Sequence, residues 1–531
     1  MKTAKQIARV LAGLCLAASA VSASSFAADT RPVKVTGGLI RGVADHGLRI
    51  YEGIPFAAPP VGDLRWRPPQ PVKPWRGVKQ TTAFAPECMQ NQARNASLGL
   101  PIMPISEDCL YVNVWTPAQA AKSAKAHLPV MIWIYGGGFW AGGASLPMYD
   151  GAALARRGVV VVSIAYRLNA FGFLAHPELS AEAPDHASGL YGIQDMIAAL
   201  KWTKANAAAF GGDPKDVTIF GQSAGGFAVS ILAASPEAKG LFERVISESG
   251  GRFSPAKSGD EGGSGSVTLE AGEAHGQAYL SKMHVDTIAE ARKLPAEVLM
   301  AEAAAEQGTF QPVQGGRIMP EDAWVAYQHG RFNDVPVLIG FNSDEGAYSV
   351  KTTTAAEHED YIRKGFGEKA DALLKVYPNG PDGLTLHSAR NIRRDTNFGW
   401  QTWAWARQQS AHGKGKVFMY YTTHRPPGTP DGQGATHGTE LPYVFGHPAK
   451  TWTAEDTALS DTLQGYWVNF ARTGDPNGPG LPVWPAYSDA APQVMALDTP
   501  PHPAPVPNME QLKALDDYYA WRRGQQAGGA G

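Results

Sequence analysis

The sequence predicts an α/β fold in which helices cover both faces of a large, mainly parallel central sheet. Short, continuous apolar runs recur from about residue 129, beginning with residues 130–135 (VMIWIY) and 159–166 (VVVVSIAY). Runs of this kind are typical of strands that are buried on both faces. Residues 191–202 (YGIQDMIAALKW) instead place apolar side chains at helical spacing. Alternation of these two patterns indicates a layered α/β architecture.

Four later segments predict further strands of the same sheet: residues 217–220 (VTIF), 244–249 (RVISES), 335–340 (VPVLIG) and 416–421 (KVFMYY). The helical pattern before the first of them stops near Gly211 and Gly212. Residues 254–266 (SPAKSGDEGGSGS) are rich in glycine, serine and charge. Because strand-like runs continue beyond this segment, it is interpreted as a surface loop or insertion. We therefore expect residues 28–531 to form one large domain.

The composition excludes some classes of partner. The chain has 531 residues, 44% of them hydrophobic, and a formal net charge of −2. This balance offers no basic footprint for nucleic acid and no strong attraction to anionic lipid. Beyond the N-terminus, no stretch of about 18 uninterrupted apolar residues suggests a membrane span.

The N-terminus has the pattern of a secretory signal peptide. Lys2, Lys5 and Arg9 precede an apolar stretch, which is followed by small residues and a Ser-Phe-Ala motif ending at Ala27. Cleavage after Ala27 would remove residues 1–27 and send the chain to the periplasm or the medium. A lipid anchor on Cys15 is the alternative, but Leu14 is large for that processing. A cytosolic N-terminal helix is a further alternative.

Cysteine usage predicts one disulfide. The chain has three cysteines, and Cys15 would leave with the signal peptide. Cys88 and Cys109 remain as an even pair in an exported protein, which predicts a bond between them. Two buried free thiols are the alternative.

Ser223 is the candidate nucleophile. It lies in the sequence VTIFGQSAGGF, with Gly221 and Gly225 on either side, after a short strand-like run and before a small, apolar helical segment. A G-x-S-x-G motif is weak by itself, but a sharp strand-to-helix turn that presents a serine hydroxyl requires both flanks. A flexible turn without chemistry is the competing interpretation.

A nucleophilic serine also needs donors for the oxyanion that it creates. The segment YGGGFWAGG follows the 130–135 strand and places Gly137 and Gly138 at its carboxyl end. Their N–H groups, with that of Ala224, are the predicted oxyanion hole. The same glycines loosely match a dinucleotide fingerprint ending at Ala141, but neither a following helical stretch nor an acidic residue after the next strand supports it.

Further distinctive motifs extend over nearly the whole mature chain: YEGIPFAAPPVGDLRWRPPQP, SEDCLYVNVWTP, WIYGGGFWAGG, YRLNAFGFL, GFNSDEGAY, HGTELPYVFG and WVNFARTGDPN. With these motifs the chain resembles the type-B carboxylesterase family, the branch of the α/β-hydrolase fold that includes bacterial p-nitrobenzyl esterases and cholinesterases. The resemblance implies an α/β-hydrolase fold with long inserted loops.

The resemblance also implies the partners of Ser223. Glu345 follows the 335–340 strand and precedes Gly346, as the family's catalytic acid does; neighbouring Asp344 is the rival. His437 follows the 416–421 strand and is the implied base, with His424 as the alternative. The order serine, acid, histidine is that of α/β-hydrolases. Arg65 and Glu107 lie where the family forms a structural ion pair.

One departure concerns the residue before the nucleophile. It is Gln222, where the family more often has glutamate, so less attraction for cationic substrates is expected. A second departure is that the glycine-rich segment lacks the cysteine pair of many eukaryotic members. Phe139, Trp140 and Met148 could line an apolar gorge or belong to the core. No metal-binding motif occurs in the sequence, and ester hydrolysis by a serine nucleophile needs no cofactor.

These observations predict an exported serine carboxylesterase that acts on uncharged esters of modest size. One alternative is a specialised hydrolase of a bulky ester, carbamate or lactone. Another, from a different class, is a catalytically silent binding module of the same fold. The expected partner is a small-molecule ester, with no nucleic acid and no membrane span. The oligomeric state is not predicted.

Overall fold

The computed structural model describes residues 27–28, 31–93, 96, 101–120, 127–259, 261–306 and 308–528. The predicted signal peptide therefore lies outside the described residues, apart from Ala27. That residue pairs with Ala44 in a two-residue strand. Within the described part of the chain, no helix is both long and apolar enough to cross a membrane.

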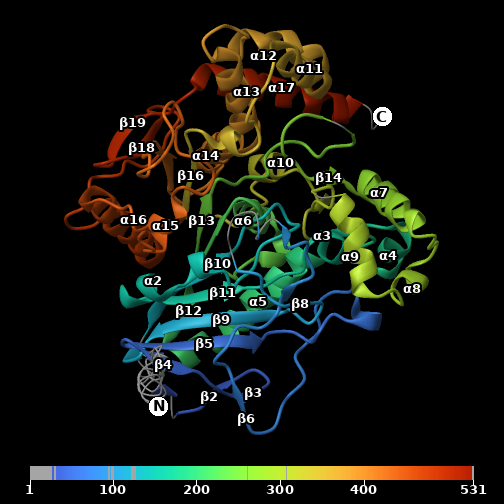
Figure 1. Ribbon diagram of the computed structural model, residues 1–531, viewed down its shortest axis with the longest axis vertical. Coiled ribbons are helices and arrows are strands. Elements are labelled where there is room, and N and C mark those ends of the chain that lie inside the picture. Colours follow the sequence, from blue (N-terminus) through green and yellow to red (C-terminus); the bar gives the residue numbers. More distant parts are fainter. Residues whose placement is uncertain are drawn as a thin grey trace, which may run out of the picture.

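A 12-stranded sheet runs through the molecule (Figure 1). Its strands, in spatial order, are β1 (Ala27–Ala28), β4 (Val43–Asp45), β5 (Leu48–Pro55), β9 (Tyr111–Pro117), β11 (Val160–Ile164), β10 (Leu128–Ile134), β12 (Gly212–Gln222), β13 (Arg244–Glu248), β16 (Val337–Asn342), β17 (Val417–Thr422), β18 (Gln493–Leu497) and β19 (His502–Pro505). Neighbours from β11 to β18 pair in parallel, and the outer pairs are antiparallel. The predicted mainly parallel sheet is thus confirmed.

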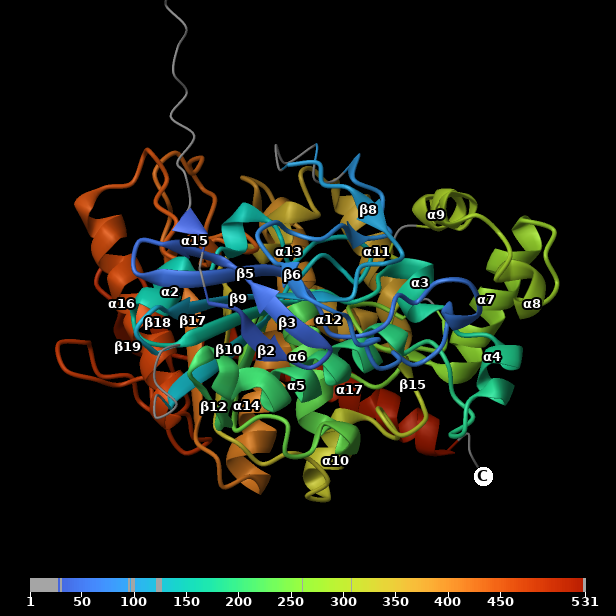
Figure 2. The ribbon, with the colours of Figure 1, turned by 90° about the horizontal axis from the view of Figure 1, so that it is seen from below.

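Two sets of helices cover the sheet. α2 (Ala152–Arg156) and α16 (Ala454–Thr473) contact its strands on one side, and Arg157, directly after α2, donates to Asp461 of α16. α5 (Tyr191–Asn206), α6 (Ala224–Ala234) and α14 (Trp400–His412) contact strands β11 to β17 on the other (Figures 1 and 2). Between the layers, β11 and β16 are fully buried and β12 is buried from Val217 onward, as their apolar sequences predict.

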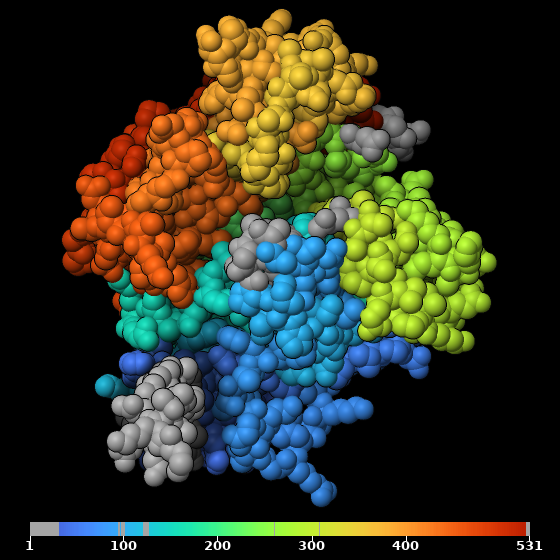
Figure 3. Space-filling view, in the orientation of Figure 1, coloured from blue at the N-terminus to red at the C-terminus, as the bar shows by residue number. Residues whose placement is uncertain are grey.

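The remaining helices belong to the long excursions between strands. They are α3 (Asn169–Phe173), α4 (Pro177–Glu182), α7 (Leu269–Lys282), α8 (Ile288–Ala291), α9 (Ala296–Ala305), α10 (Ala323–Gln328), α11 (Ala355–Phe366), α12 (Ala370–Val376), α13 (Leu384–Arg394), α15 (Leu441–Val444) and α17 (Met509–Gly528). On the face seen in Figure 3, the gold helices α11 to α13 and the yellow-green helices α7 to α9 stand apart, with green chain between them.

Three small sheets flank the large one: β2 (Val33–Val35) with β3 (Gly38–Arg41) and β6 (Val78–Gln80), β7 (Glu87–Cys88) with β8 (Ile105–Ser106), and β14 (Val267–Thr268) with β15 (Val313–Gln314). The predicted disulfide between Cys88 and Cys109 is present. Arg65 and Glu107 form the expected ion pair through two hydrogen bonds of 2.7 Å. Arg65 also donates to three backbone carbonyls from residues 291–294, so the pair fastens the N-terminal segment to the excursion that carries α8.

Candidate active site

Ser223 occupies a strained turn between β12 and α6. Its φ of 58° and ψ of −124° lie in a region that L-residues rarely adopt. Its N–H donates to Glu248 O at 2.8 Å, which anchors the turn to the neighbouring strand β13. A β-carbon at Gly225 would stand 1.9 Å from Ile134 O, and one at Gly221 would stand 2.7 Å from the same atom. The glycines of the motif are therefore required by close backbone approach, and a merely flexible turn does not explain them.

The glycine-rich loop after β10 bends beside this turn. Gly137, Gly138 and Phe139 have consecutive positive φ angles of 120°, 66° and 67°. Gly137 O accepts hydrogen bonds from Trp140 N and Ala141 N, both at 3.1 Å. The next helical turn along the chain begins only at Pro147. The loop therefore lacks the helix that a dinucleotide-binding fingerprint requires, and the alternative interpretation does not fit.

Glu345 is fully buried at the carboxyl end of β16. Its Oε1 accepts a 2.8 Å hydrogen bond from Asn342 N and another from Ser249 Oγ. Its Oε2 faces His437 Nδ1 at 3.8 Å. Neither of these two atoms has a hydrogen-bond partner among the described residues, so each is available to the other. The rival Asp344 points elsewhere, toward the Arg390 guanidinium at 3.5 Å and Gly434 N at 3.3 Å.

His437 lies in the loop after β17. Its ring stacks on Phe398, with centroids 4.7 Å apart and planes 22° apart, and also contacts Tyr348. Its Nε2 lies 3.2 Å from the side-chain nitrogen of Gln222. Among the described residues no hydrogen bond joins Ser223 Oγ to this ring. Hydrogen bonds between catalytic groups are often long without substrate and tighten when it binds.

The alternative base His424 is already used in the fold. Its Nε2 lies 2.8 Å from Asp456 Oδ1 and 3.0 Å from the Tyr443 hydroxyl. Asp456 in turn caps the N-terminus of α16 by accepting from Thr453 N at 2.7 Å. His424 is thus held in a structural network that does not include Ser223.

Two buried carboxyl groups near the site were not predicted from the sequence. Glu248 accepts a 2.8 Å hydrogen bond from Trp467 Nε1, and burial raises the pKa of its carboxyl well above the ordinary value. Glu440 accepts from the side chain of Asn342, and burial raises its pKa to about 7. Glu440 is three residues beyond His437, and no charge pattern in the sequence distinguishes it from a solvated glutamate.

Ser223 opens into a cavity of about 640 Å³. Gly138, Trp140, Phe227, Phe310 and Phe398 are among its lining residues. Much of the segment 254–266 lines the same cavity, so the predicted surface loop forms part of its wall. Trp140 is therefore a cavity residue, whereas Phe139 is fully buried against Phe173 at 5.0 Å between ring centroids. Met148 is half-buried and packs against the core.

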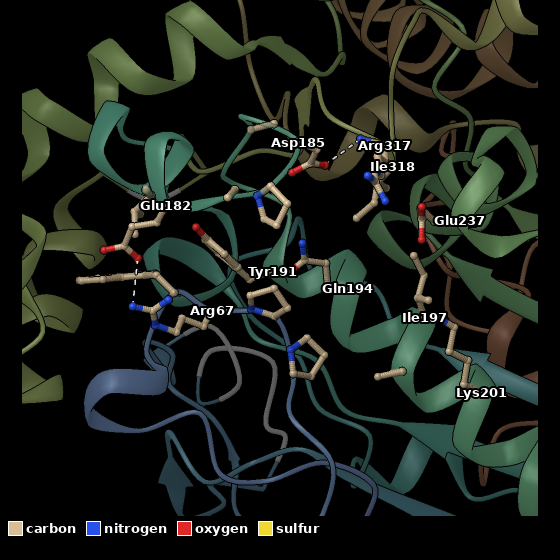
Figure 4. A pocket seen from close by; sticks show the side chains of 18 residues that line it. Arg67, Glu182, Asp185, Tyr191, Gln194, Ile197, Lys201, Glu237, Arg317 and Ile318 are labelled. Atoms are coloured by element: carbon tan, nitrogen blue, oxygen red, sulfur yellow. Dashed lines mark hydrogen bonds and ion pairs between the residues drawn. The ribbon is translucent and has the colours of Figure 1, made fainter.

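A second pocket, of about 590 Å³, lies along α5 beside α4 and the loop after Trp66 (Figure 4). Tyr191, Gln194 and Lys201 line it from α5. An ion pair between Arg67 and Glu182, at 3.4 Å, closes one side. Its lining does not include Ser223, Glu345 or His437. The cavity over Ser223 is therefore the candidate active site.

Comparison with known proteins gives the same family throughout the chain. The model of the carboxylesterase family matches residues 29–517. A fumonisin B1 esterase of Sphingopyxis macrogoltabida is 36% identical over 504 residues, covering 89% of this chain and 87% of that protein. A para-nitrobenzyl esterase of Bacillus subtilis is 37% identical over 481 residues, covering 87% and 94%. A liver carboxylesterase of Sus scrofa is 35% identical over 487 residues, covering 83% of each.

Solved structures agree. A PNB esterase superposes with a TM-score of 0.79 at 33% identity, covering 92% of this chain and all of that one. A thermophilic PNB esterase superposes with a TM-score of 0.80 at 32% identity and the same coverage. The predicted α/β-hydrolase fold is confirmed by these neighbours. The chain belongs to the carboxylesterase family, in its type-B branch, and is a carboxylic ester hydrolase.

Proposed function

We propose that this protein hydrolyses carboxylic esters through Ser223, His437 and Glu345, and that Gly137, Gly138 and Ala224 supply the oxyanion hole. The observation that carries the proposal is the strained Ser223 turn, which lies beside the glycine loop and opens into the cavity. The facing pair of unsatisfied atoms on Glu345 and His437 supports the assignment of acid and base.

In the first step, neutral His437 accepts the Ser223 proton at Nε2 while Ser223 Oγ attacks the ester carbonyl carbon. The proton on Nδ1 points toward Glu345, which stays ionised, orients the ring and stabilises the imidazolium. The N–H groups of Gly137, Gly138 and Ala224 donate to the oxyanion of the tetrahedral intermediate.

Collapse of that intermediate releases the alcohol, which takes the proton from His437 Nε2. Water then attacks the acyl-enzyme, with His437 again acting as base, and the carboxylic acid leaves. Each step conserves atoms and charge with water as the only co-reactant. Ser223 is regenerated at the end of the cycle.

The proposed substrates are uncharged esters of modest size. A cavity of about 640 Å³ is within the range of small-molecule sites, and aromatic side chains form much of its wall. Gln222 beside the nucleophile contributes no charge of its own. From the N-terminal sequence pattern we also propose that the protein is exported after removal of residues 1–27. The strand-like runs on both sides of the segment 254–266 support one domain over residues 28–531.

Two alternatives make different predictions. A specialised hydrolase of a bulky ester, carbamate or lactone would not hydrolyse short-chain esters, but its activity would still require Ser223. A catalytically silent binding module would turn over none of these compounds. The retention of serine, acid and histidine in family order favours an active enzyme.

The decisive experiment is hydrolysis of p-nitrophenyl butyrate by purified residues 28–531 beside the Ser223→Ala variant. Activity that disappears in the variant supports the nucleophile. Equal activity in both proteins contradicts the assignment of Ser223. No activity in either protein, with carbamates and lactones also inert, favours the binding module.

A further inference from the structure

We propose that Gln311, oriented by the buried Arg252, is a positioning residue that holds the glycine loop 136–139 in the conformation needed to bind the oxyanion. This inference rests on the proposed function, because it assumes that Gly137 and Gly138 act as oxyanion donors. Neither Gln311 nor Arg252 lies in a motif that the sequence analysis singled out.

The glycine loop is strained, so its backbone conformation needs stabilising contacts from other parts of the chain. Three consecutive residues, Gly137, Gly138 and Phe139, have positive φ angles, and Phe139 pays the steric penalty of a β-carbon in that region. Backbone groups fix two of the carbonyls: Gly137 O accepts from Trp140 N, and Phe139 O accepts from Asn169 N at 2.7 Å. The carbonyl between them is fixed by a side chain.

That side chain is Gln311, which belongs to the loop after α9. Its Nε2 donates to Gly138 O at 3.1 Å and to Gly308 O at 3.1 Å. Since the carbonyls on both sides of Gly138 are held, its peptide planes cannot rotate without breaking a hydrogen bond. The Gly138 N–H group lies in the peptide plane of Gly137 O, which backbone donors hold, and Gln311 holds the adjoining plane of Gly138 O. The two restraints together fix φ and ψ of Gly138 and so the direction of its N–H group relative to the rest of the loop.

Arg252 determines which end of the Gln311 amide faces the glycine loop. Arg252 Nη2 donates to Gln311 Oε1 at 2.9 Å. A guanidinium has donors and no acceptor, so it selects the amide oxygen and turns the amide nitrogen toward Gly138 O. With the amide reversed, two donors would face each other at one end and two acceptors at the other.

The surroundings of Arg252 hold its guanidinium in place to orient the Gln311 amide. Its guanidinium lies over the Phe227 ring at 4.5 Å and the Phe139 ring at 5.7 Å. It donates to Ser264 Oγ at 3.2 Å, and no carboxylate pairs with it among the described residues. Burial lowers its pKa to about 9, which leaves it charged at neutral pH. Arg252 thus joins the glycine loop, the helix behind Ser223 and the cavity wall.

The test separates the hydrogen bond from packing. Gln311→Glu keeps the size of the side chain and its contact with Arg252 but places an acceptor against Gly138 O at pH 8. Gln311→Leu removes all three hydrogen bonds of this side chain, to Gly138, Gly308 and Arg252. Arg252→Met removes the guanidinium, and Arg252→Lys is the conservative replacement. Gln328→Glu, on the exposed end of α10, is the control for an added negative charge.

Each variant is measured with p-nitrophenyl butyrate and with two inhibitors. 1,1,1-Trifluoro-2-octanone forms a tetrahedral adduct with an active serine and requires the oxyanion hole, whereas unreactive 2-octanone reports cavity binding alone. Thermal unfolding verifies that each variant is folded.

We expect Gln311→Glu and Gln311→Leu to lower kcat by about ten- to a hundredfold, with KM changed less than about threefold. The Ki of the trifluoromethyl ketone should rise by the factor by which kcat/KM falls, while the Ki of 2-octanone stays constant. Arg252→Met should behave likewise, Arg252→Lys should recover most of kcat, and Gln328→Glu should match the wild type.

The inference is overturned if Gln311→Glu keeps the wild-type kcat, or if both ketones weaken equally in the Gln311 variants. Failure of the proposed function looks different. In that case the wild type itself is inactive, or Ser223→Ala is as active as the wild type, and the inference falls with it.

Discussion

The side-chain nitrogen of Gln222 lies 3.2 Å from Nε2 of His437. An amide N–H directed at Nε2 requires a lone pair there, which places the proton of the neutral ring on Nδ1. Nδ1 is the atom that faces Glu345 Oε2. Gln222 therefore favours the tautomer that the proposed base needs, in which Nε2 carries the lone pair and Nδ1 carries the proton.

Gln222→Glu should change the pH dependence of the reaction. A carboxylate in place of the amide stabilises the protonated ring, so a larger fraction of the base is inactive near neutrality. We expect the acidic limb of kcat/KM for p-nitrophenyl butyrate to move to higher pH by about one unit. The measurement is a pH–rate profile from pH 5 to 9, with Gln328→Glu as the charge control. An unshifted limb would show that residue 222 does not interact with the base.

The neighbouring acids Glu345 and Asp344 provide a matched pair of substitutions. Glu345→Gln leaves the shape of the site but removes the negative charge beside His437, and kcat should fall by about a thousandfold or more. Asp344→Asn removes a charge that faces Arg390, so kcat should change less than about threefold. Steady-state kinetics with p-nitrophenyl butyrate distinguishes the two. A larger loss for Asp344→Asn would reverse the assignment.

The central strands were predictable because burial on both faces leaves an unbroken apolar run, as in β10 and β11. Strands nearer the edges were not. β5 contains Arg49 and Glu52, and β9 contains Asn113, so neither resembles a buried parallel strand. Their pairing is set by tertiary contacts.

The same distinction applies to the site. Ser223 and the glycine loop are proposed because the chemistry they would perform needs a local motif, and His437 and Glu345 because a family resemblance implies them. Ser249 and Gln311 lie in no comparable motif. They reach Glu345 and Gly138 across long sequence separations, so only the folded chain brings them there.

The turn that presents Ser223 should not tolerate a larger residue at Gly225. A β-carbon there would meet the backbone of β10, which cannot move aside as a side chain can. We expect Gly225→Ala to lower the free energy of unfolding by about 3 kcal/mol, with loss of activity. Gly524→Ala is the control, because position 524 of α17 is exposed, a β-carbon there meets nothing, and alanine favours a helix over glycine by about 1 kcal/mol. Denaturant unfolding and p-nitrophenyl butyrate turnover test both. A Gly225→Ala protein as stable as the wild type would mean that the turn can relax.

Glu440→Gln should stabilise the protein relative to the wild type, and this gain in unfolding free energy should be larger at neutral pH than at acidic pH. Burial raises the pKa of the Glu440 carboxyl from about 4.5 to about 7, so the folded chain keeps a proton that the unfolded chain loses in this window. Between these two pKa values the unfolded chain binds fewer protons than the folded chain. The unfolding free energy of the wild type therefore falls as pH rises through this range, and the loss is complete near pH 7. Glutamine removes this penalty while keeping an acceptor for Asn342.

The difference in unfolding free energy between Glu440→Gln and wild type should therefore grow in favour of the variant by up to about 3 kcal/mol from pH 4.5 to pH 8. Urea unfolding at several pH values measures it. Glu368→Gln, at an exposed position after α11, should show no such trend because its surroundings are the same water in both states. A difference for Glu440→Gln that stays flat across this range would mean that the carboxyl is ionised within the fold, where the Asn342 side chain and the neighbouring His437 would have to compensate its burial.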